Sequence, residues 1–228
     1  MTEREKILAR VREALKSKAH VPGAHSTAPP AASAQSAAGG ARQWLPKVGD
    51  SMDEQFELFA KHAAELKADF QLLNSVEEMR RALVRLRILE GWERVAAHTG
   101  DLTQAICPPL NLPLLPTDKP YDVHALEACS AGISECDALV AQTGSVLVTS
   151  RSAGGRALSV LPPHHVVLAR REQLVPDLPA AFELLKKKYG HNYPSMISFI
   201  TGPSRTGDIE RILVLGAHGP KKLTILCF

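Results

Sequence analysis

From about residue 49 onward, short apolar runs alternate with segments of helical periodicity, and this alternation limits the fold more than any other feature. The apolar runs cover 69–73, 94–99, 112–116, 164–170, 195–201 and 222–228. Continuous apolar strands are typical of parallel sheets that are covered on both faces. The pattern predicts a three-layer α/β fold, in which a mostly parallel sheet carries helices on both faces.

Capping boxes mark where the helices of this region begin. Ser51 to Glu54 and Ser75 to Glu78 have the S/T-x-x-E form, which satisfies free backbone donors at a helix start. A third helix is predicted from Asp177 to Tyr189. The section 137–170 lacks a helical pattern, and it predicts antiparallel strands on either side of residues 142–144.

The N-terminal region is organised differently. Residues 1–18 begin with another capping box, at Thr2, and carry an apolar stripe at helical spacing, which predicts one amphipathic helix. Residues 19–48 are rich in Ala, Ser, Pro and Gly and predict a flexible linker. The α/β domain is then 49–228. The helix is expected to dock on this domain, on a second copy or on another protein, with a partner favoured by the length of the linker.

Charge is distributed unevenly along the chain. Residues 1–48 hold eight Lys/Arg and three Glu, giving +5, whereas the other 19 Lys/Arg and 21 acidic residues give −2. A nucleic-acid-binding domain needs a basic face on its folded body, so this distribution argues against nucleic acid. No apolar run approaches the roughly 20 residues that span a bilayer, and no signal-peptide core is visible. We therefore expect a cytoplasmic protein.

The four cysteines show neither C-x-x-C nor zinc-finger spacing, which favours buried thiols over a metal site. They are Cys107, Cys129, Cys136 and Cys227. We therefore expect no metal in this chain.

The stretch 201–220 concentrates Gly, Pro and polar residues where a strand is predicted to end. In α/β sheets ligands bind beyond the carboxyl ends of the strands. A helix is predicted to begin at Thr206 and to end at Gly216, and its free N–H groups beside Arg205 would bind an anion. The alternative is a tight loop closed by an internal pair of Arg205 and Asp208. The candidate ligand-binding residues of this stretch are Gly202, Ser204, Arg205, Thr206, Asp208, His218 and Gly219, with His218 and Asp208 also the candidates for catalysis.

A second polar stretch lies between the two apolar runs of 137–150. A hairpin or bulge explains Gly144 alone, but the polar Gln142 and Thr143 beside it are less easily explained by packing, and the three are candidate ligand-binding residues. Arg156, a further candidate, follows two glycines that can present it to a pocket. Of His164 and His165, strand alternation is expected to send one inward and one outward. No P-loop, nucleophile elbow or dinucleotide fingerprint is present.

Three stretches resemble the lactate-utilisation protein C family, which carries the LUD domain. They are GISECDALVAQTGSVLVTS, RALSVLPPHHVVL and GPSRTGDIERILVLGAHGP, and the N-terminal REKILARVREAL is also similar. The resemblance covers nearly the whole chain apart from the linker. It implies the fold shared by ribose-5-phosphate isomerase, glucosamine-6-phosphate deaminase and CoA transferases.

The resemblance also implies a function. The family is similar to one component of a three-protein bacterial system that oxidises L-lactate to pyruvate, whose other components carry iron–sulphur clusters. This chain lacks their cysteine motifs, so the clusters are expected on partner subunits and no cofactor on this chain. The family often has an acidic residue where Gln142 stands, and related CoA transferases use a glutamate in a comparable loop as nucleophile. An amide cannot form that acyl intermediate, which argues against thioester chemistry at Gln142.

Three functions remain open. The first is a non-cluster subunit of the lactate-oxidising system, incomplete as an oxidoreductase by itself, which binds a small carboxylate or the iron–sulphur subunits. The alternative is a stand-alone enzyme or binder acting on a sugar phosphate or a CoA-type substrate, as fold relatives do. The third is an assembly or regulatory protein without a substrate.

Overall fold

The computed structural model describes residues 3–14, 46–206, 214–216 and 218–228, and it separates the chain into Met1–Leu45 and Pro46–Phe228. The described element of the first unit is helix α1 (Glu3–Ala14), on which Ile7 and Leu8 are exposed. Most of the expected linker lies outside the described residues. Within the described residues, no helix is long and apolar enough to cross a membrane.

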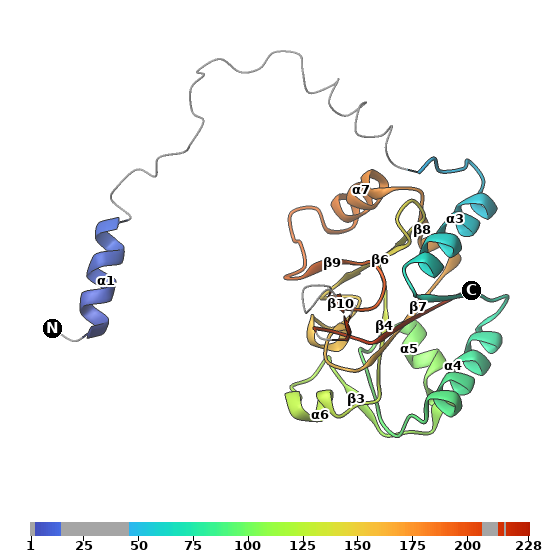
Figure 1. Ribbon diagram of the computed structural model, residues 1–228, viewed down its shortest axis with the longest axis horizontal. Coiled ribbons are helices and arrows are strands. Elements are labelled where there is room, and N and C mark those ends of the chain that lie inside the picture. The colour runs from blue at the N-terminus through green and yellow to red at the C-terminus, as the bar shows by residue number, and fades with distance from the viewer. Residues whose placement is uncertain (1–2, 15–45, 207–213, 217) are drawn as a thin grey trace, which may run out of the picture. The chain divides into compact units, whose positions relative to one another are not determined.

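A six-stranded parallel sheet forms the centre of the second unit (Figure 1). Its spatial order is β1-β12-β7-β4-β2-β3, and every adjacent pair is parallel. The strands are β1 (Asp69–Leu72), β2 (Val95–Ala97), β3 (Leu114–Pro116), β4 (Ala131–Glu135), β7 (His164–Ala169) and β12 (Lys222–Cys227). Five were predicted from their apolar runs, and β4 was not.

Helices α4 (Val76–Glu90) and α5 (Asp101–Ile106) cover one face of this sheet. Met79, Leu83 and Ile106 of these helices pack in one buried cluster with apolar residues of β2, β4, β7 and β12. Helix α4 begins where the Ser75 side chain accepts a hydrogen bond from the backbone of Glu78, and it ends at Gly91 in the left-handed conformation.

The other face packs partly against a second, four-stranded sheet in the order β8-β5-β6-β9. The strands are β5 (Ala138–Val140), β6 (Ser145–Thr149), β8 (Leu174–Val175) and β9 (Ile197–Ile200). Pairs β5–β6 and β6–β9 are antiparallel and β5–β8 is parallel. Helix α3 (Met52–Glu65) shares the core between the sheets, and α7 (Leu178–Tyr189) covers the outer face of the second sheet.

These layers confirm the α/β class with a mostly parallel sheet and helices. Figure 1 shows α7 and the second sheet at one end of this unit and α4 and α5 at the other. The antiparallel strands predicted around residues 142–144 are β5 and β6. The remaining short elements are α6 (Val123–Glu127) and the 3-10 helices η2 (Pro108–Leu110), η3 (Ala157–Ser159) and η4 (Arg171–Gln173).

Two expectations about the strands are wrong. His164 and His165 are both buried, because β7 lies in the middle of a sheet that is covered on both faces. The helix expected from Thr206 to Gly216 is contradicted at its end, because Val214–Leu215 (β11) is a strand that pairs with Arg205–Thr206 (β10) as an antiparallel ribbon. Gly216 therefore follows a strand, and residues 207–213, with Asp208, lie outside the described residues.

Candidate functional site

The turn Gln142–Gly144 connects β5 to β6 and packs against α3. Gly144 has φ +62°, and a Cβ there would lie 2.8 Å from the Cβ of His62 and 2.9 Å from the backbone nitrogen of Ala63. Gln142 is buried, and its amide nitrogen donates to the carbonyl of Pro46 at 3.3 Å. The close approach of α3 gives the glycine a packing reason, which sequence alone did not supply.

Gly202 contacts the same helix four residues further along. It has φ +90°, and a Cβ there would lie 2.7 Å from the carbonyl oxygen of Leu66. Between the two glycine turns, the hydroxyls of Ser145 and Thr201 lie 2.8 Å apart. The structure thus brings two predicted stretches together, at the end of the second sheet where β6 begins and β9 ends.

The rest of the 201–220 stretch lies at the amino end of β12. The backbone nitrogen of Ser204 donates to the carbonyl of Pro220 at 2.9 Å, and a Cβ at Gly219 would lie 3.1 Å from that of Ser204. The side chains of Arg205 and His218 are exposed and have no hydrogen bond or ion pair with a described residue. This is the opposite edge of the parallel sheet from the one at which α/β folds bind ligands.

The carboxyl ends of β2, β3 and β4 carry a group of polar residues that the sequence reasoning missed. His98 and Thr99 follow β2, and Thr117 and Asp118 follow β3. The Thr99 hydroxyl donates to Asp118 at 2.5 Å and the Thr99 backbone nitrogen at 3.3 Å, and the hydroxyl hydrogen bond is the main cause that holds the pKa of Asp118 below its usual value. Thr117 is tied to β2 through its backbone nitrogen, which donates to the carbonyl of Ala97.

Glu135, the last residue of β4, occupies the start of α5. Its Oε1 accepts the backbone N–H groups of Leu102 at 2.8 Å and Thr103 at 3.1 Å. A Cβ at Gly100 would lie 2.1 Å from the same oxygen, so the glycine makes room for the carboxylate. The free N–H groups of this short helix are therefore satisfied internally.

Gly154 brings the loop after β6 onto this group. It has φ +65°, and a Cβ there would lie 2.6 Å from both His98 Nδ1 and Thr117 Oγ1. Both of these atoms are buried and have no hydrogen-bond partner among the described residues. Buried polar atoms are almost always hydrogen-bonded in folded proteins, so this pair marks unused hydrogen-bonding capacity. Gln142 Oε1, Thr143 Oγ1 and His62 Nε2, at the turn that packs against α3, are buried and unpartnered among the described residues as well. We call His98, Thr99, Thr117, Asp118 and Gly154 the His98 site.

Two hollows lie on this unit. One of about 590 Å³ is lined by His98, and one of about 640 Å³ lies along α4, away from His98 and Thr117. The smaller one is lined by His98 and Thr99 with residues of α5 and the segment before β3, and its lining contains no Lys or Arg. Cys107 also lines it, but burial and the charge of Glu135 raise the pKa of this thiol to about 12. The thiol is therefore protonated near neutral pH and is not a nucleophile.

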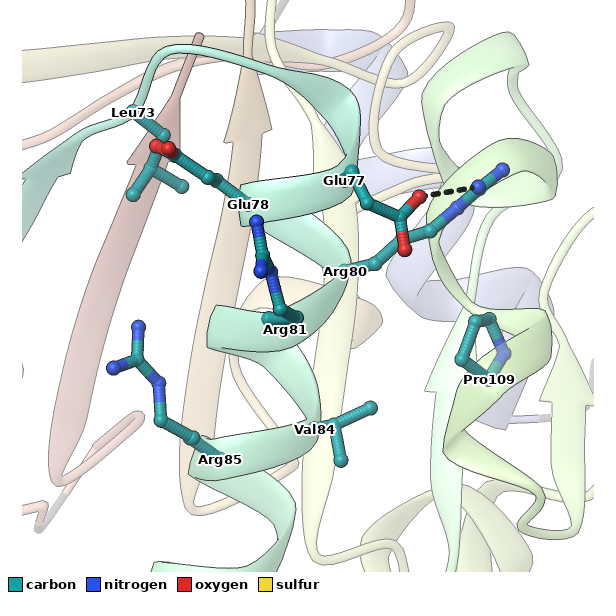
Figure 2. Close-up of a pocket in the computed structure, with 8 residues that line it drawn as sticks. All are labelled: Leu73, Glu77, Glu78, Arg80, Arg81, Val84, Arg85 and Pro109. Atoms are coloured by element: carbon teal, nitrogen blue, oxygen red, sulfur yellow. Dashed lines mark hydrogen bonds and ion pairs between the residues drawn. The ribbon is translucent and has the colours of Figure 1, made fainter.

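The larger hollow runs along α4 (Figure 2). Figure 2 shows Arg80 turned toward Glu77, to which it donates at 2.9 Å, while Val84 and Pro109 line the same side. The Arg80 Nε also donates to the carbonyl of Ala105. None of its described lining residues holds a buried polar side-chain atom without a partner. We take His98 as the candidate site because it lies at the carboxyl ends of the parallel strands, where α/β folds bind ligands, and the turn against α3 does not.

Of the sequence candidates, Arg156 is the one that this geometry places near the His98 site. It is exposed and lies two residues beyond Gly154, and both Gly154 and Gly155 have positive φ. The signal that sequence reasoning passed over is the polar His98-Thr99-Gly100-Asp101 directly after the apolar run of β2. Within the described residues, no group of three or more His, Cys, Asp or Glu is placed to hold a metal ion.

Residues 115–227 match the family model of the LUD domain, a stretch that contains Thr117, Asp118, Glu135 and Arg156. Among curated proteins, the chain is 35% identical over 105 residues to lactate utilization protein C 1 of Bacillus mycoides, covering 45% of each chain. It is 36% identical over 105 residues to lactate utilization protein C of Anoxybacillus flavithermus, covering 46% of each chain. The chain thus matches less than half the length of these relatives.

Among solved structures, the chain is similar to the crystal structure of a DUF162 family protein from Deinococcus radiodurans. The TM-score is 0.60 with 20% sequence identity, and the match covers 78% of this chain and 99% of that one. This likeness supports the fold alone. Residues 115–227, slightly under half of the chain, therefore match the LUD domain.

Proposed function

We propose that this chain takes part in bacterial lactate utilisation as a subunit that binds a small 2-hydroxy or 2-oxo carboxylate at the His98 site. The relatives that bear the name lactate utilization protein C support the first part. The pair of unpartnered buried atoms, His98 Nδ1 and Thr117 Oγ1, carries the second part.

Lactate and pyruvate each carry a carboxylate next to a carbon that bears an oxygen. Gly154 fills the space in front of His98 and Thr117, so the ligand would displace this turn. Its hydroxyl or carbonyl oxygen would then take up the hydrogen-bonding capacity of His98 and Thr117, since an imidazole nitrogen and a hydroxyl can each donate or accept. Arg156, presented by two glycines, would take the carboxylate through its guanidinium fork. The ligand would thus be held by neutral hydrogen bonds at the oxygen on its second carbon and by a charged pair at its carboxylate.

A phosphate-bearing substrate is the less favoured alternative. Phosphate sites use cationic side chains or free N–H groups at a helix start. The hollow beside His98 is lined by no Lys or Arg, and Glu135 occupies the N–H groups at the start of α5. The Glu135 carboxylate repels any anion, and a phosphate ester carries more negative charge than lactate or pyruvate, so the phosphate is disfavoured more strongly. These observations favour a small carboxylate over a sugar phosphate or CoA.

We assign the oxidation itself to a complex rather than to this chain alone. Removing two electrons from lactate requires an acceptor, and we propose that iron–sulphur clusters on partner subunits supply it. The four cysteines of this chain are buried, and burial raises the pKa of Cys227 to about 12. Thiols in such surroundings do not readily become the thiolates that bind a cluster.

Calorimetric titration of the purified chain tests this proposal. L-lactate and pyruvate are expected to bind, and propionate, which lacks the oxygen on the second carbon, is expected to bind more weakly. Thr117→Val removes the hydroxyl at nearly constant volume, so it should weaken lactate binding about tenfold and leave propionate unchanged. Arg156→Gln should weaken all three carboxylates.

Arg81→Gln on α4 provides the matched control, because Arg81 is exposed and lies on the other hollow. This variant should bind lactate as the wild type does. Binding of ribose 5-phosphate or CoA without binding of any carboxylate would overturn the proposal in favour of the phosphate-bearing class. Equal binding of lactate to wild type and Thr117→Val would remove the His98 site from it.

A further inference from the structure

A buried carboxylate lies behind the loop that reaches the His98 site. Asp137 follows β4, its side chain is fully buried, and three side chains donate to it. Tyr189 Oη and Lys188 Nζ lie 2.5 Å and 2.6 Å from Oδ1, and Ser152 Oγ lies 2.7 Å from Oδ2. Two of these donors belong to the end of α7, and the third belongs to the loop after β6.

The loop that contains Ser152 is a closed turn. The Ser152 hydroxyl accepts the backbone N–H of Thr149 at 2.9 Å, and the backbone nitrogen of Ala153 donates to the carbonyl of Thr149 at the same distance. Ala153 is completely buried. These hydrogen bonds close the turn on itself, and the hydrogen bond from Ser152 to Asp137 attaches the closed turn to the buried carboxylate.

Arg151 adds a second attachment on the same side. Its guanidinium donates to the carbonyl of Asn192 at 3.1 Å and lies 5.1 Å from the centre of the Tyr189 ring. At the other end of the turn, Gly154 touches His98 and Thr117. Residues 149–155 thus connect the end of α7 to the carboxyl ends of β2 and β3.

We propose that Asp137 is the positioning residue of the His98 site, which holds the turn 149–155 in place through Ser152 and thereby sets how closely Gly154 lies against the pair His98–Thr117. Asp137 does not touch a ligand in this arrangement, because its side chain is fully buried under Ser152, Lys188 and Tyr189. The part of the proposal that concerns ligand affinity rests on the proposed function, and the part that concerns the turn does not.

The carboxylate is suited to this role because it remains charged. Burial alone would raise the pKa of Asp137, but the hydrogen bonds from Lys188, Tyr189 and Ser152 outweigh burial and lower it. Hydrogen bonds to an ionised acceptor are shorter and stronger than those between neutral groups. The turn is therefore held by a stronger contact than a neutral side chain would give at this position.

Ser152→Ala removes the loop partner of Asp137 together with the acceptor of the Thr149 N–H, and it leaves Asp137 with Lys188 and Tyr189. Ser159→Ala is the matched control, since the Ser159 hydroxyl donates only to the carbonyl of Arg156 further along the same segment. Two readouts are taken on folded protein at one temperature. These are the imidazole signals of His98 in nitrogen–proton NMR spectra and the rate of trypsin cleavage after Arg151 and Arg156.

In Ser152→Ala, the His98 signals should shift and cleavage should become roughly tenfold faster, because the turn loses its hydrogen bond to the charged Asp137 and its internal bond from Thr149. Ser159→Ala should match the wild type in both. A loss of global stability alone would not move the His98 ring signals of the folded molecules. Unchanged His98 signals and unchanged cleavage in Ser152→Ala would overturn the proposal.

Tyr189→Phe supplies a second variant, which removes one donor to Asp137 from the α7 side, and the same changes are expected at a smaller size. Titration with L-lactate then separates the two proposals. If the wild type does not bind lactate but Ser152→Ala shifts His98, the proposed function fails and the positioning role stands. If lactate binds equally to the wild type and Ser152→Ala, the positioning role is overturned while the proposed function stands.

Discussion

At the scale of single residues, Gly154 and Gly91 have nearly the same backbone conformation in very different surroundings. Their φ angles are +65° and +63°, but a Cβ at Gly154 would lie 2.6 Å from two atoms, and a Cβ at Gly91 would meet nothing within 4 Å. Gly91→Ala should therefore show the cost of the left-handed conformation alone, about 1–2 kcal/mol. Gly154→Ala should cost about 1–3 kcal/mol more, because the methyl group must displace His98 or Thr117.

Urea denaturation of the two variants measures the difference, and lactate titration of Gly154→Ala should show no binding while Gly91→Ala binds normally. Equal free energies of unfolding for the two variants would mean that the turn yields to the methyl group. The contact between Gly154 and the His98 site would then be loose.

The sequence marks Gly144 and Gly202 as special positions, and the structure adds a cause that the sequence does not show. Both glycines lie against residues of α3 or its C-cap, and Gly144 lies in the hairpin between β5 and β6. A sequence shows that a position needs glycine, but it does not show which atoms approach it. His98 was passed over because a single histidine at the end of a strand has no local pattern that separates it from a structural one.

At the scale of elements, the start of α5 depends on a residue from a different strand. Glu135 accepts the N–H groups of Leu102 and Thr103, and no side chain of the N-cap residue, Gly100, can do so. Glu135→Ala should therefore destabilise the protein by about 1–2 kcal/mol, as other lost helix caps do. Glu135→Gln should lose less, because the amide oxygen still accepts hydrogen bonds.

Amide hydrogen exchange at Leu102 and Thr103 gives the local readout. Both amides should exchange faster in Glu135→Ala than in the wild type, while the amide of Glu78, which Ser75 caps on α4, should be unchanged. Exposed Glu93→Ala serves as the control for removing a negative charge. Unchanged exchange at Leu102 and Thr103 would show that the backbone of α5 is held by its packing alone.

The sequence pattern did not predict helix α5 or strand β4. Both are short, and both depend on contacts with residues that are distant in the sequence. Helix α5 has 6 residues, too few for a periodic pattern to be recognised. Strand β4 contains Gly132, where a Cβ would lie 2.5 Å from the carbonyl oxygen of Leu158. The glycine weakens the strand pattern and is explained only by the crossing segment. Strand β9 was predicted correctly, but its membership of the second sheet depends on pairing with β6.

At the scale of the whole molecule, the two sheets and their helices bury β7 on both faces. The alternation of apolar runs and helices was enough to predict the α/β class, because a parallel sheet requires helical crossovers. It was not enough to predict the four-stranded sheet between the parallel sheet and α7, because strand partners are chosen by tertiary packing. That packing buries two adjacent histidines, His164 and His165, at the amino end of β7.

Those histidines make the stability of the whole molecule depend on pH. Nε2 of His164 lies 2.9 Å from the hydroxyl of Thr224, and Nε2 of His165 lies 2.9 Å from that of Ser134. Burial lowers the pKa of each imidazole to about 4 from an ordinary value of 6.5. The folded state therefore favours the neutral rings, so their contribution is fully present above pH 6.5 and is lost as the pH falls toward 4.

The expected loss by pH 5 is about 2 kcal/mol for each ring, because an unfolded chain binds a proton there and the folded chain does not. Urea denaturation from pH 8 to pH 5 measures this loss of unfolding free energy. The pKa of Asp137 is lowered from its ordinary value of 3.8, so Asp137 contributes only at lower pH. The double variant His164→Gln/His165→Gln should flatten the dependence, whatever its stability at pH 8, whereas exposed His124→Gln should keep it. If the double variant still loses as much unfolding free energy between pH 6.5 and 5 as the wild type does, the titrating groups lie elsewhere in the fold. The neutral state of the two histidines would then have no consequence for stability.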